Sequence, residues 1–387
     1  MAGGGPVDVL VIGAGMVGAA CAYSCAAAGL RVTVLERGAV GSGTTSAGEG
    51  NILVSDKEPG AELELALLSV RLWAGLAERI GAERLEFEAK GGVVVARTAE
   101  AAEGLAALAA AQRDRGVEVV DVTAAELAEL EPNLTREVSS GAYYPQDMQV
   151  QPVLAAAELL RRSRLLGATV HTGCEVLGLQ RGRDGAVVGA TTSAGEFAAR
   201  FTVNAAGTWG GDVAAMAGVH VPVLPRKGFI LVTEPLPRVV RHKVYSADYV
   251  ANVASGDAGL ETSVVVEGTR AGTVLIGASR ERVGFDRQVS LPVLRRLAAQ
   301  AIDLFPFLAD VTLLRSYLGF RPYCPDHLPV IGADPRAPGL VHACGHEGAG
   351  IGLAAATGHL IAQTLTGAVP DLDLTPFRPD RFAEDAA

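Results

Sequence analysis

The chain has 387 residues and a formal net charge of −10 at pH 7, which disfavours nucleic-acid binding because phosphates attract basic patches. Its five cysteines include no C-x-x-C pair, which disfavours a metal centre. Ala supplies much of the 49% hydrophobic content, and no uninterrupted apolar stretch approaches a membrane span, so we predict no integral membrane segment. No Lys or Arg precedes Arg31, so we expect no secretory signal and a cytoplasmic location, and the length suits two domains.

The first predicted elements form a βαβ unit. An apolar strand beginning at Val7 stops at the motif Gly13-Ala14-Gly15-Met16-Val17-Gly18, which opens a helix of small residues. Gly13 allows the tight turn, Gly15 lets a pyrophosphate approach the backbone, and Gly18 permits close packing of helix and strand. We therefore expect the helix N-terminus, with Met16 and Val17, to face phosphates.

An acid ends the second strand of this unit. Glu36 lies 18 positions after Gly18, where a carboxylate accepts hydrogen bonds from both ribose hydroxyls of an adenosine. It would also repel a 2′-phosphate, which argues against NADP. Strand, helix, second strand and acid together predict a dinucleotide site.

Small and hydroxyl-bearing residues follow Glu36. The run has no periodicity, so it is either a flexible surface loop or a second binding loop whose backbone N–H groups contact phosphate and ribityl oxygens. Its position directly after the ribose-binding acid favours the second interpretation. The residues that we assign to cofactor binding here are Arg37, Ser42, Gly43, Thr44, Thr45, Ser46, Gly48, Gly50 and Asn51.

These features resemble flavoproteins of the D-amino-acid oxidase superfamily. The resemblance rests on the GxGxxG unit, the Glu36-Arg37 strand end and the Gly-Ser-Gly-Thr-Thr-Ser-Ala-Gly run. Within the superfamily the chain is most similar to glycine and sarcosine oxidases and to the flavin subunits of hydrogen cyanide synthase and of hydroxyproline or opine dehydrogenases; the phrase at 48–57 resembles the dehydrogenase group. The resemblance implies FAD, rather than NAD, as the cofactor.

The rest of the chain alternates helical and extended patterns. A capping box at Thr123 and Glu126 opens a short helix, and the turn at 181–185 joins two strands as a hairpin. Further helices are predicted at 61–81, 99–115, 153–166 and 291–305, and strands at 87–96, 168–172, 175–180, 186–192, 200–205, 229–233, 263–267, 273–277 and 339–342.

Later stretches resemble further FAD contacts of the superfamily. In the family a hairpin of the 175–192 kind crosses the sheet, and the resemblance places Val176 at the adenine. A Gly-rich helix N-terminus aimed at the flavin pyrimidine ring would stabilise negative charge on the reduced cofactor. The resemblance assigns to the cofactor Ala206, Gly207, Trp209, Gly345, Gly348, Ala349, Gly350 and Ile351.

The functional phrase with the strongest resemblance spans Leu318 to Gly332. Within its Gly-Phe-Arg-Pro segment, Arg321 matches the carboxylate-binding arginine of the family. A carboxylate is bound best by a planar, permanently charged fork, which Arg provides. The alternative is a structural Arg in a surface turn.

Four further residues are candidates for the substrate site. His346 and Glu347 suit removal of a proton from the substrate ammonium, because the amine must be neutral before hydride leaves its carbon; they equally suit shaping of the loop. Aromatic residues that close the family's pockets are not evident at 263–267, so Tyr245 and Tyr249, in the preceding loop, are proposed as substitutes.

Two features bear on the flavin and on its reoxidation. Covalent flavin in sarcosine oxidases needs a Cys where this chain has Gly319, and Cys324 stands directly before Pro325 instead, so we expect noncovalent FAD. The resemblance to dehydrogenase subunits leaves O2, a quinone or a partner subunit as electron acceptor, and a homo- or hetero-oligomer as the assembly.

The sequence therefore predicts an α/β fold with two domains. A Rossmann-like FAD-binding domain with a parallel sheet and a β-hairpin crossover comprises 1–85, 150–218 and 319–387; an α+β substrate-binding domain with an antiparallel sheet comprises 86–149 and 219–318. The expected reaction oxidises the C–N bond of a glycine-like, N-substituted, cyclic or D-amino acid to an imine or keto acid, by hydride transfer to flavin N5. The alternatives are an FAD-dependent 2-hydroxy-acid dehydrogenase and a flavin subunit active only within a hetero-oligomeric dehydrogenase.

Overall fold

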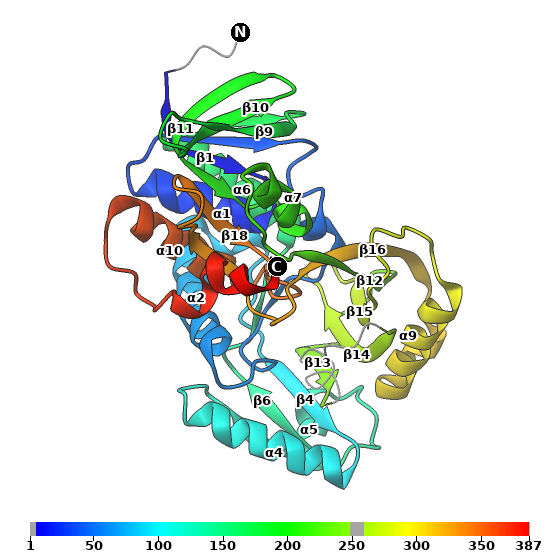
Figure 1. Cartoon of the computed structure of the whole chain (residues 1–387). Helices are drawn as coiled ribbons and strands as arrows, with labels where there is room; N and C mark the ends of the chain where they lie inside the picture. The colour runs from blue at the N-terminus through cyan, green and yellow to red at the C-terminus, as the bar shows by residue number, and fades with distance from the viewer. Residues whose placement is uncertain (1–4, 248–258, 387) are drawn as a thin grey trace.

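Two eight-stranded sheets dominate the computed structural model, which describes residues 5–247 and 259–386 (Figure 1). The predicted mixed α/β class is confirmed, with one largely parallel and one largely antiparallel sheet. Within the described ranges, no helix combines the length and apolar character needed to cross a bilayer.

The first sheet is largely parallel because helical crossovers connect its strands. Its order is β17 (Val330–Ala333), β18 (Leu340–Cys344), β11 (Gly195–Asn204), β1 (Val7–Ile12), β2 (Val32–Glu36) and β8 (Thr169–Thr172). β17 runs antiparallel to β18. The predicted hairpin consists of β9 (Val176–Arg181) and β10 (Val187–Thr192), which pairs with the first residues of β11 and lies above β1 in Figure 1.

Four long helices belong to the same half of the molecule. They are α1 (Met16–Ala27), α2 (Ala61–Ile80), α6 (Pro152–Leu165) and α10 (Ala354–Thr366). α1 packs against both α6 and α10, and α10 packs against α2. The backbones of α1 and α10 approach closely, because a Cβ on Gly358 would lie only 2.5 Å from the Ala20 carbonyl group.

The second sheet is antiparallel except where β13 pairs with β4. Its order is β16 (Leu313–Tyr323), β12 (Leu224–Thr233), β15 (Val274–Arg280), β14 (Glu261–Gly268), β13 (Lys243–Ser246), β4 (Gly92–Ala96), β6 (Ser140–Tyr144) and β5 (Val120–Thr123). The helix α9 (Leu291–Leu304) packs on β12, β14 and β15.

Strand alternation decides which side chains of β12 reach the site. Phe229 and Leu231 lie in the hydrophobic cluster beneath α9. Gly228 and Ile230 face the opposite side of the sheet, as successive strand residues must, and line a cavity there.

The remaining elements of the described residues lie between those named above. The predicted capping box is confirmed at the start of α5 (Ala124–Leu130), where Thr123 and Glu126 cap each other. The others are α3 (Ala82–Leu85), α4 (Ala99–Arg113), α7 (Gly210–Met216), the paired strands β3 (Asn51–Ile52) and β7 (Met148–Gln149), and 3-10 turns at Thr44–Ala47, Gly207–Trp209, Pro306–Asp310, Thr375–Phe377 and Pro379–Ala386.

The division into an FAD-binding and a substrate-binding domain remains a proposal. Strands of the first sheet fall within the ranges assigned to the FAD-binding domain. β16 crosses the proposed boundary between 318 and 319, because one continuous strand runs from the outer end of the second sheet to the cavity.

We expect the contact between α1 and α10 to tolerate no added methyl group. Gly358→Ala should destabilise the protein by about 1–3 kcal/mol, because the new Cβ would overlap the backbone of α1. Gly104→Ala is the matched control: Gly104 is exposed in α4 with no atom within 4 Å of its added Cβ, so it should stabilise by about 0.5–1 kcal/mol. Thermal unfolding of both variants measures this, and equal shifts would contradict the close approach.

Candidate functional site

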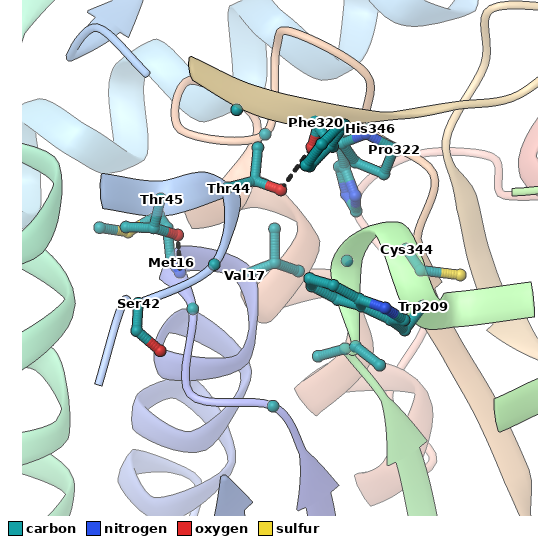
Figure 2. A pocket seen from close by; sticks show the side chains of 18 of the residues that line it. Met16, Val17, Ser42, Thr44, Thr45, Trp209, Phe320, Pro322, Cys344 and His346 are labelled. Carbon is teal, nitrogen blue, oxygen red and sulfur yellow. Dashed lines mark hydrogen bonds between the residues drawn. The ribbon is translucent and has the colours of Figure 1, made fainter. Parts of the chain in front are cut away.

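A cavity of about 500 Å³ lies between the two sheets (Figure 2). One end is formed by the turn after β1 and the start of α1, and the other by β12 and β16 of the second sheet. A single hollow thus joins the predicted dinucleotide site to the predicted carboxylate site.

The glycines of the GxGxxG motif allow backbones to meet. Gly13 has φ +106°, and a Cβ there would lie 2.5 Å from the Ala205 carbonyl oxygen. Gly18 does not line the cavity; a Cβ on it would lie 2.0 Å from the Gly13 oxygen, so its task is packing. Gly15 lines the cavity and carries no side-chain cap for α1. The open helix N-terminus fits a pyrophosphate.

Two groups orient the loops around this turn. Glu36 accepts hydrogen bonds from the backbone N–H of Ala14 at 2.8 Å and of Gly38 at 2.7 Å. Each carboxylate oxygen keeps a second acceptor position, so Glu36 still fits ribose hydroxyls. Thr45 accepts from the Met16 N–H at 3.0 Å, drawn in Figure 2, and ties the following loop to α1.

Two aromatic rings and a guanidinium stack on one another at one side of the cavity. The ring of Trp209 is parallel to that of Phe285, at an interplanar angle of 7° and a centroid distance of 5.4 Å. The Arg37 guanidinium carbon lies 3.9 Å from the centroid of Trp209. The stack therefore packs a residue of the strand β2 end, a residue of the 207–209 turn and a residue from beyond β15 against one another.

Arg321 lies at the second-sheet end of the cavity. Its Nη1 donates a hydrogen bond to the Ser279 carbonyl at 2.8 Å. The guanidinium lies over Gly228, where a Cβ would come within 2.2 Å of Nη1. The fork is therefore held by the strands beneath it while it lines the cavity.

Glu347 is engaged in ion pairs. It accepts from Arg226 Nη1 at 2.6 Å and from His327 Nδ1 at 2.9 Å. Burial alone would raise the pKa of Glu347, but the hydrogen bond from His327 and the charge of Arg226 outweigh it and hold that pKa below its usual value. Glu347 is thus a carboxylate at neutral pH.

His346 is a neutral imidazole of defined tautomer. Its Nε2 lies 3.0 Å from the Thr357 hydroxyl, which donates its hydrogen to the Leu353 carbonyl at 2.9 Å. Nε2 must therefore carry the proton, which leaves Nδ1 with a lone pair. Burial lowers the pKa of His346 to about 3.

Most predicted site residues come together around the cavity. Those that line it are Gly13, Gly15, Met16, Val17, Glu36, Arg37, Ser42, Gly43, Thr44, Thr45, Gly48, Asn51, Val176, Ala206, Gly207, Trp209, Arg321, His346, Glu347, Gly348, Gly350 and Ile351. Among the described residues, Ser46, Gly50, Gly345 and Ala349 are outside the lining set together with Gly18.

The expectation for Tyr245 needs correction. Tyr245 is not in a loop at the cavity; it lies in strand β13, fully buried, and its hydroxyl donates to Ser55 Oγ at 2.5 Å. Ser55 in turn bonds to the buried Asp147. The side chain faces the core because pairing with β14 and β4 sets its direction. Tyr249 lies outside the described residues.

Several residues that line the cavity were not predicted from the sequence. Glu49 stands inside the small-residue run, where a lone acid between two glycines was the available signal. Gly228 and Ile230 required knowledge of which face α9 covers, and Arg287 and Cys344 follow no motif. The missed residues lie at both ends of the cavity, with Leu35 and Cys344 at the first-sheet end and Ile230 at the second-sheet end.

Comparison with known proteins gives consistent matches. Residues 8–364 match the model of the DAO family, described as FAD dependent oxidoreductase. Glycine oxidase of Geobacillus kaustophilus is 32% identical over 96% of each chain, and its crystal structure superposes with a TM-score of 0.87 at 29% identity, covering 97% of this chain and 99% of that chain. Hydrogen cyanide synthase subunit HcnC of Pseudomonas aeruginosa is 29% identical over 98% of this chain and 97% of its own.

A second solved structure extends the match beyond oxidases. L-proline dehydrogenase from P. horikoshii superposes with a TM-score of 0.89 at 25% identity, covering 98% of both chains. Because the family match includes both ends of the cavity, the chain belongs to the DAO family of FAD-dependent oxidoreductases, and its cofactor is FAD.

Proposed function

We propose that this protein oxidises the C–N bond of a small amino acid to an imine, which water hydrolyses. One observation carries the proposal: the cavity that begins at the N-terminus of α1 ends at the guanidinium of Arg321. A cationic fork at that end suits the carboxylate of an amino acid. The names of two similar proteins, glycine oxidase and L-proline dehydrogenase, support a substrate of this class.

The protein's part in the reaction is to bind and to orient. FAD, when bound, supplies the acceptor for the hydride that leaves the substrate Cα. Glu36 and the open turn of α1 would hold its adenosine and pyrophosphate. Arg321 would fix the substrate carboxylate, because the bond to Ser279 holds the guanidinium in place before the substrate arrives.

His346 suits the role of proton acceptor better than Glu347. Glu347 already accepts from Arg226 and His327, so its charge is committed to holding the loop. The lone pair on His346 Nδ1 leaves that atom available as an acceptor, although its low pKa makes it a weak base. Glu347 would then act as a positioning residue for the loop at the cavity.

We also propose noncovalent FAD. Cys324 is buried outside the cavity lining, and burial raises the pKa of its thiol. Cys344 lines the cavity, but burial raises its pKa to about 12 and keeps the thiol protonated. The proposed electron acceptor is O2, a quinone or a partner subunit. The assembly is a homo-oligomer or a hetero-oligomer, and the name of HcnC, a subunit, supports the second.

Anaerobic mixing of the FAD-loaded protein with a panel of amino acids tests the proposed function. We expect a subset of them to bleach the flavin absorbance near ~450 nm, and 2-hydroxy acids of equal size to leave it unchanged. Bleaching by the hydroxy acids alone would contradict the proposal. Bleaching only after a partner subunit is added would favour the hetero-oligomeric alternative.

Removal of the Arg321 guanidinium should weaken substrate capture. Arg321→Met should lower kcat/KM by roughly 10²–10³-fold, because a buried charge pair with the carboxylate is lost. Flavin content should stay the same. Arg315→Met is the control, since Arg315 lies on the same strand but is exposed; equal losses in both variants would contradict the role of Arg321.

His346 should make stability depend on pH. Its folded pKa of about 3 lies below the value of 6.5 for an unfolded chain, so below pH 6.5 the unfolded chain takes up a proton that the folded chain refuses. The stabilisation is therefore complete above pH 6.5 and is lost progressively as the pH falls towards 3.

Urea unfolding at pH 7.5 and pH 5 compares His346→Gln with the native chain. We expect the variant to lose less stability on acidification. His220→Gln, at an exposed position, controls for the loss of one histidine and should behave like the native chain. An unchanged acid dependence in His346→Gln would contradict the buried, neutral imidazole.

A further inference from the structure

Glu49 is a buried carboxylate on the cavity wall. Its side chain is 6% exposed and lines the same hollow as Arg321. Its Oε2 accepts a hydrogen bond from Asn51 Nδ2 at 2.9 Å, and Lys243 Nζ lies 3.5 Å from that oxygen. Because a carboxylate only accepts, the amide nitrogen of Asn51 must face Glu49, which fixes the orientation of both groups.

Among the described residues, no group donates a hydrogen bond to the other oxygen of Glu49. Within the described ranges, Glu49 Oε1 is buried and has no hydrogen-bond partner, and the same holds for Asn51 Oδ1. A buried carboxylate oxygen without a donor is costly, and each such oxygen in a native structure requires an explanation. Since both residues line the cavity, a ligand that donates hydrogen bonds would satisfy them.

The charges behind Glu49 form a buried cluster. Lys243 Nζ lies 3.7 Å from Glu267, and Lys90 Nζ lies 4.0 Å from Glu267 and 3.8 Å from Glu88. Among the described residues, Glu49, Glu88 and Glu267 thus form ion pairs with Lys90 and Lys243, and the charge of Arg238 also acts on Lys90. Burial raises the pKa of Glu267 and lowers that of Lys90, because an unpaired charge is unfavourable in this buried cluster. A cationic donor at Oε1 would give the buried Glu49 oxygen a charge-assisted hydrogen bond.

The positions of Glu49 and Arg321 over the second sheet suit an amino acid between them. The Arg321 guanidinium lies over Gly228, and Glu49 Oε1 lies over Gly277, where a Cβ would be 2.8 Å from Oε1 and 2.9 Å from Ile230 Cδ1. Gly228 and Ile230 are two residues apart on one face of β12, about 7 Å along the strand. The carboxylate and ammonium of an α-amino acid, with a hydrogen bond at each end, span roughly the same length, about 8 Å.

We propose that Glu49 Oε1 accepts an N–H of the substrate ammonium while Arg321 holds its carboxylate, so that the cavity selects zwitterions. Asn51 and Lys243 act as positioning residues for Glu49. A 2-hydroxy acid of equal size would bind less well, because its hydroxyl brings one donor and no charge. The inference rests on the proposed function and names the form of the substrate that this site takes.

Two planar acids of similar shape test the assignment without turnover. Pyrrole-2-carboxylate carries a ring N–H, and furan-2-carboxylate carries a ring oxygen in its place. Binding of each to the FAD-loaded protein is measured by perturbation of the flavin spectrum and by calorimetry. We expect the pyrrole acid to bind at least about tenfold more tightly, because it donates to a charged acceptor. Equal affinities would overturn the role of Glu49.

Two variants sharpen the test. In Glu49→Gln, the Asn51 amide should attract the new carbonyl oxygen and turn the new NH2 towards the ligand, so the preference for the pyrrole acid should vanish or reverse. Glu267→Gln removes a carboxylate from the same Lys243 but does not line the cavity, so it should keep the preference. Loss of the preference in both variants would mean that Glu49 only balances charge, and would overturn the proposal.

The outcomes separate this inference from the proposed function. Binding of both acids with equal affinity, together with bleaching by amino acids, overturns the role of Glu49 alone. Failure of both acids to bind would overturn the carboxylate site at Arg321, and the role of Glu49 with it. The comparison of the two acids on the native chain needs no variant, so it remains decisive if a substitution at a buried position prevents folding.

Discussion

The carbonyl oxygen of Phe320 holds the two halves of the cavity together. It accepts a hydrogen bond from the Thr44 hydroxyl at 2.7 Å, drawn in Figure 2, and another from Thr208 at 2.8 Å. Both threonines lie in turns that follow strands of the first sheet, whereas Phe320 belongs to β16 of the second. Arg321 is the next residue, so the same junction that joins the sheets also sets where the guanidinium meets the cofactor end.

Buried ion pairs hold the loop that contains Glu347 at the cavity. Arg226, fully buried, bonds to Glu347 and to Glu261, and Glu347 holds His327. Removing one member would leave an uncompensated buried charge, which costs far more than a surface ion pair. Glu347 adopts φ +47°, an uncommon conformation for a residue with a side chain. These ion pairs explain how the Gly-rich loop keeps one shape beside the cavity.

Most of the site residues that could be predicted from the sequence belong to local motifs. The strand, the glycines and Glu36 lie within one short βαβ unit, so sequence spacing alone placed them correctly around one turn. Tyr245 could not be placed in this way, because its direction depends on the pairing of β13 with strands far away in the sequence. The role of Glu49 could not be predicted either, because Lys243 and strand β15 come close to it only in the folded chain.

A crystal structure of the FAD-loaded protein with bound pyrrole-2-carboxylate tests the central claim most directly. We expect the carboxylate within ~3 Å of the Arg321 guanidinium and the ring N–H directed at Glu49. A ligand seated elsewhere, without contact to Arg321, would contradict the placement of the substrate at the end of the cavity.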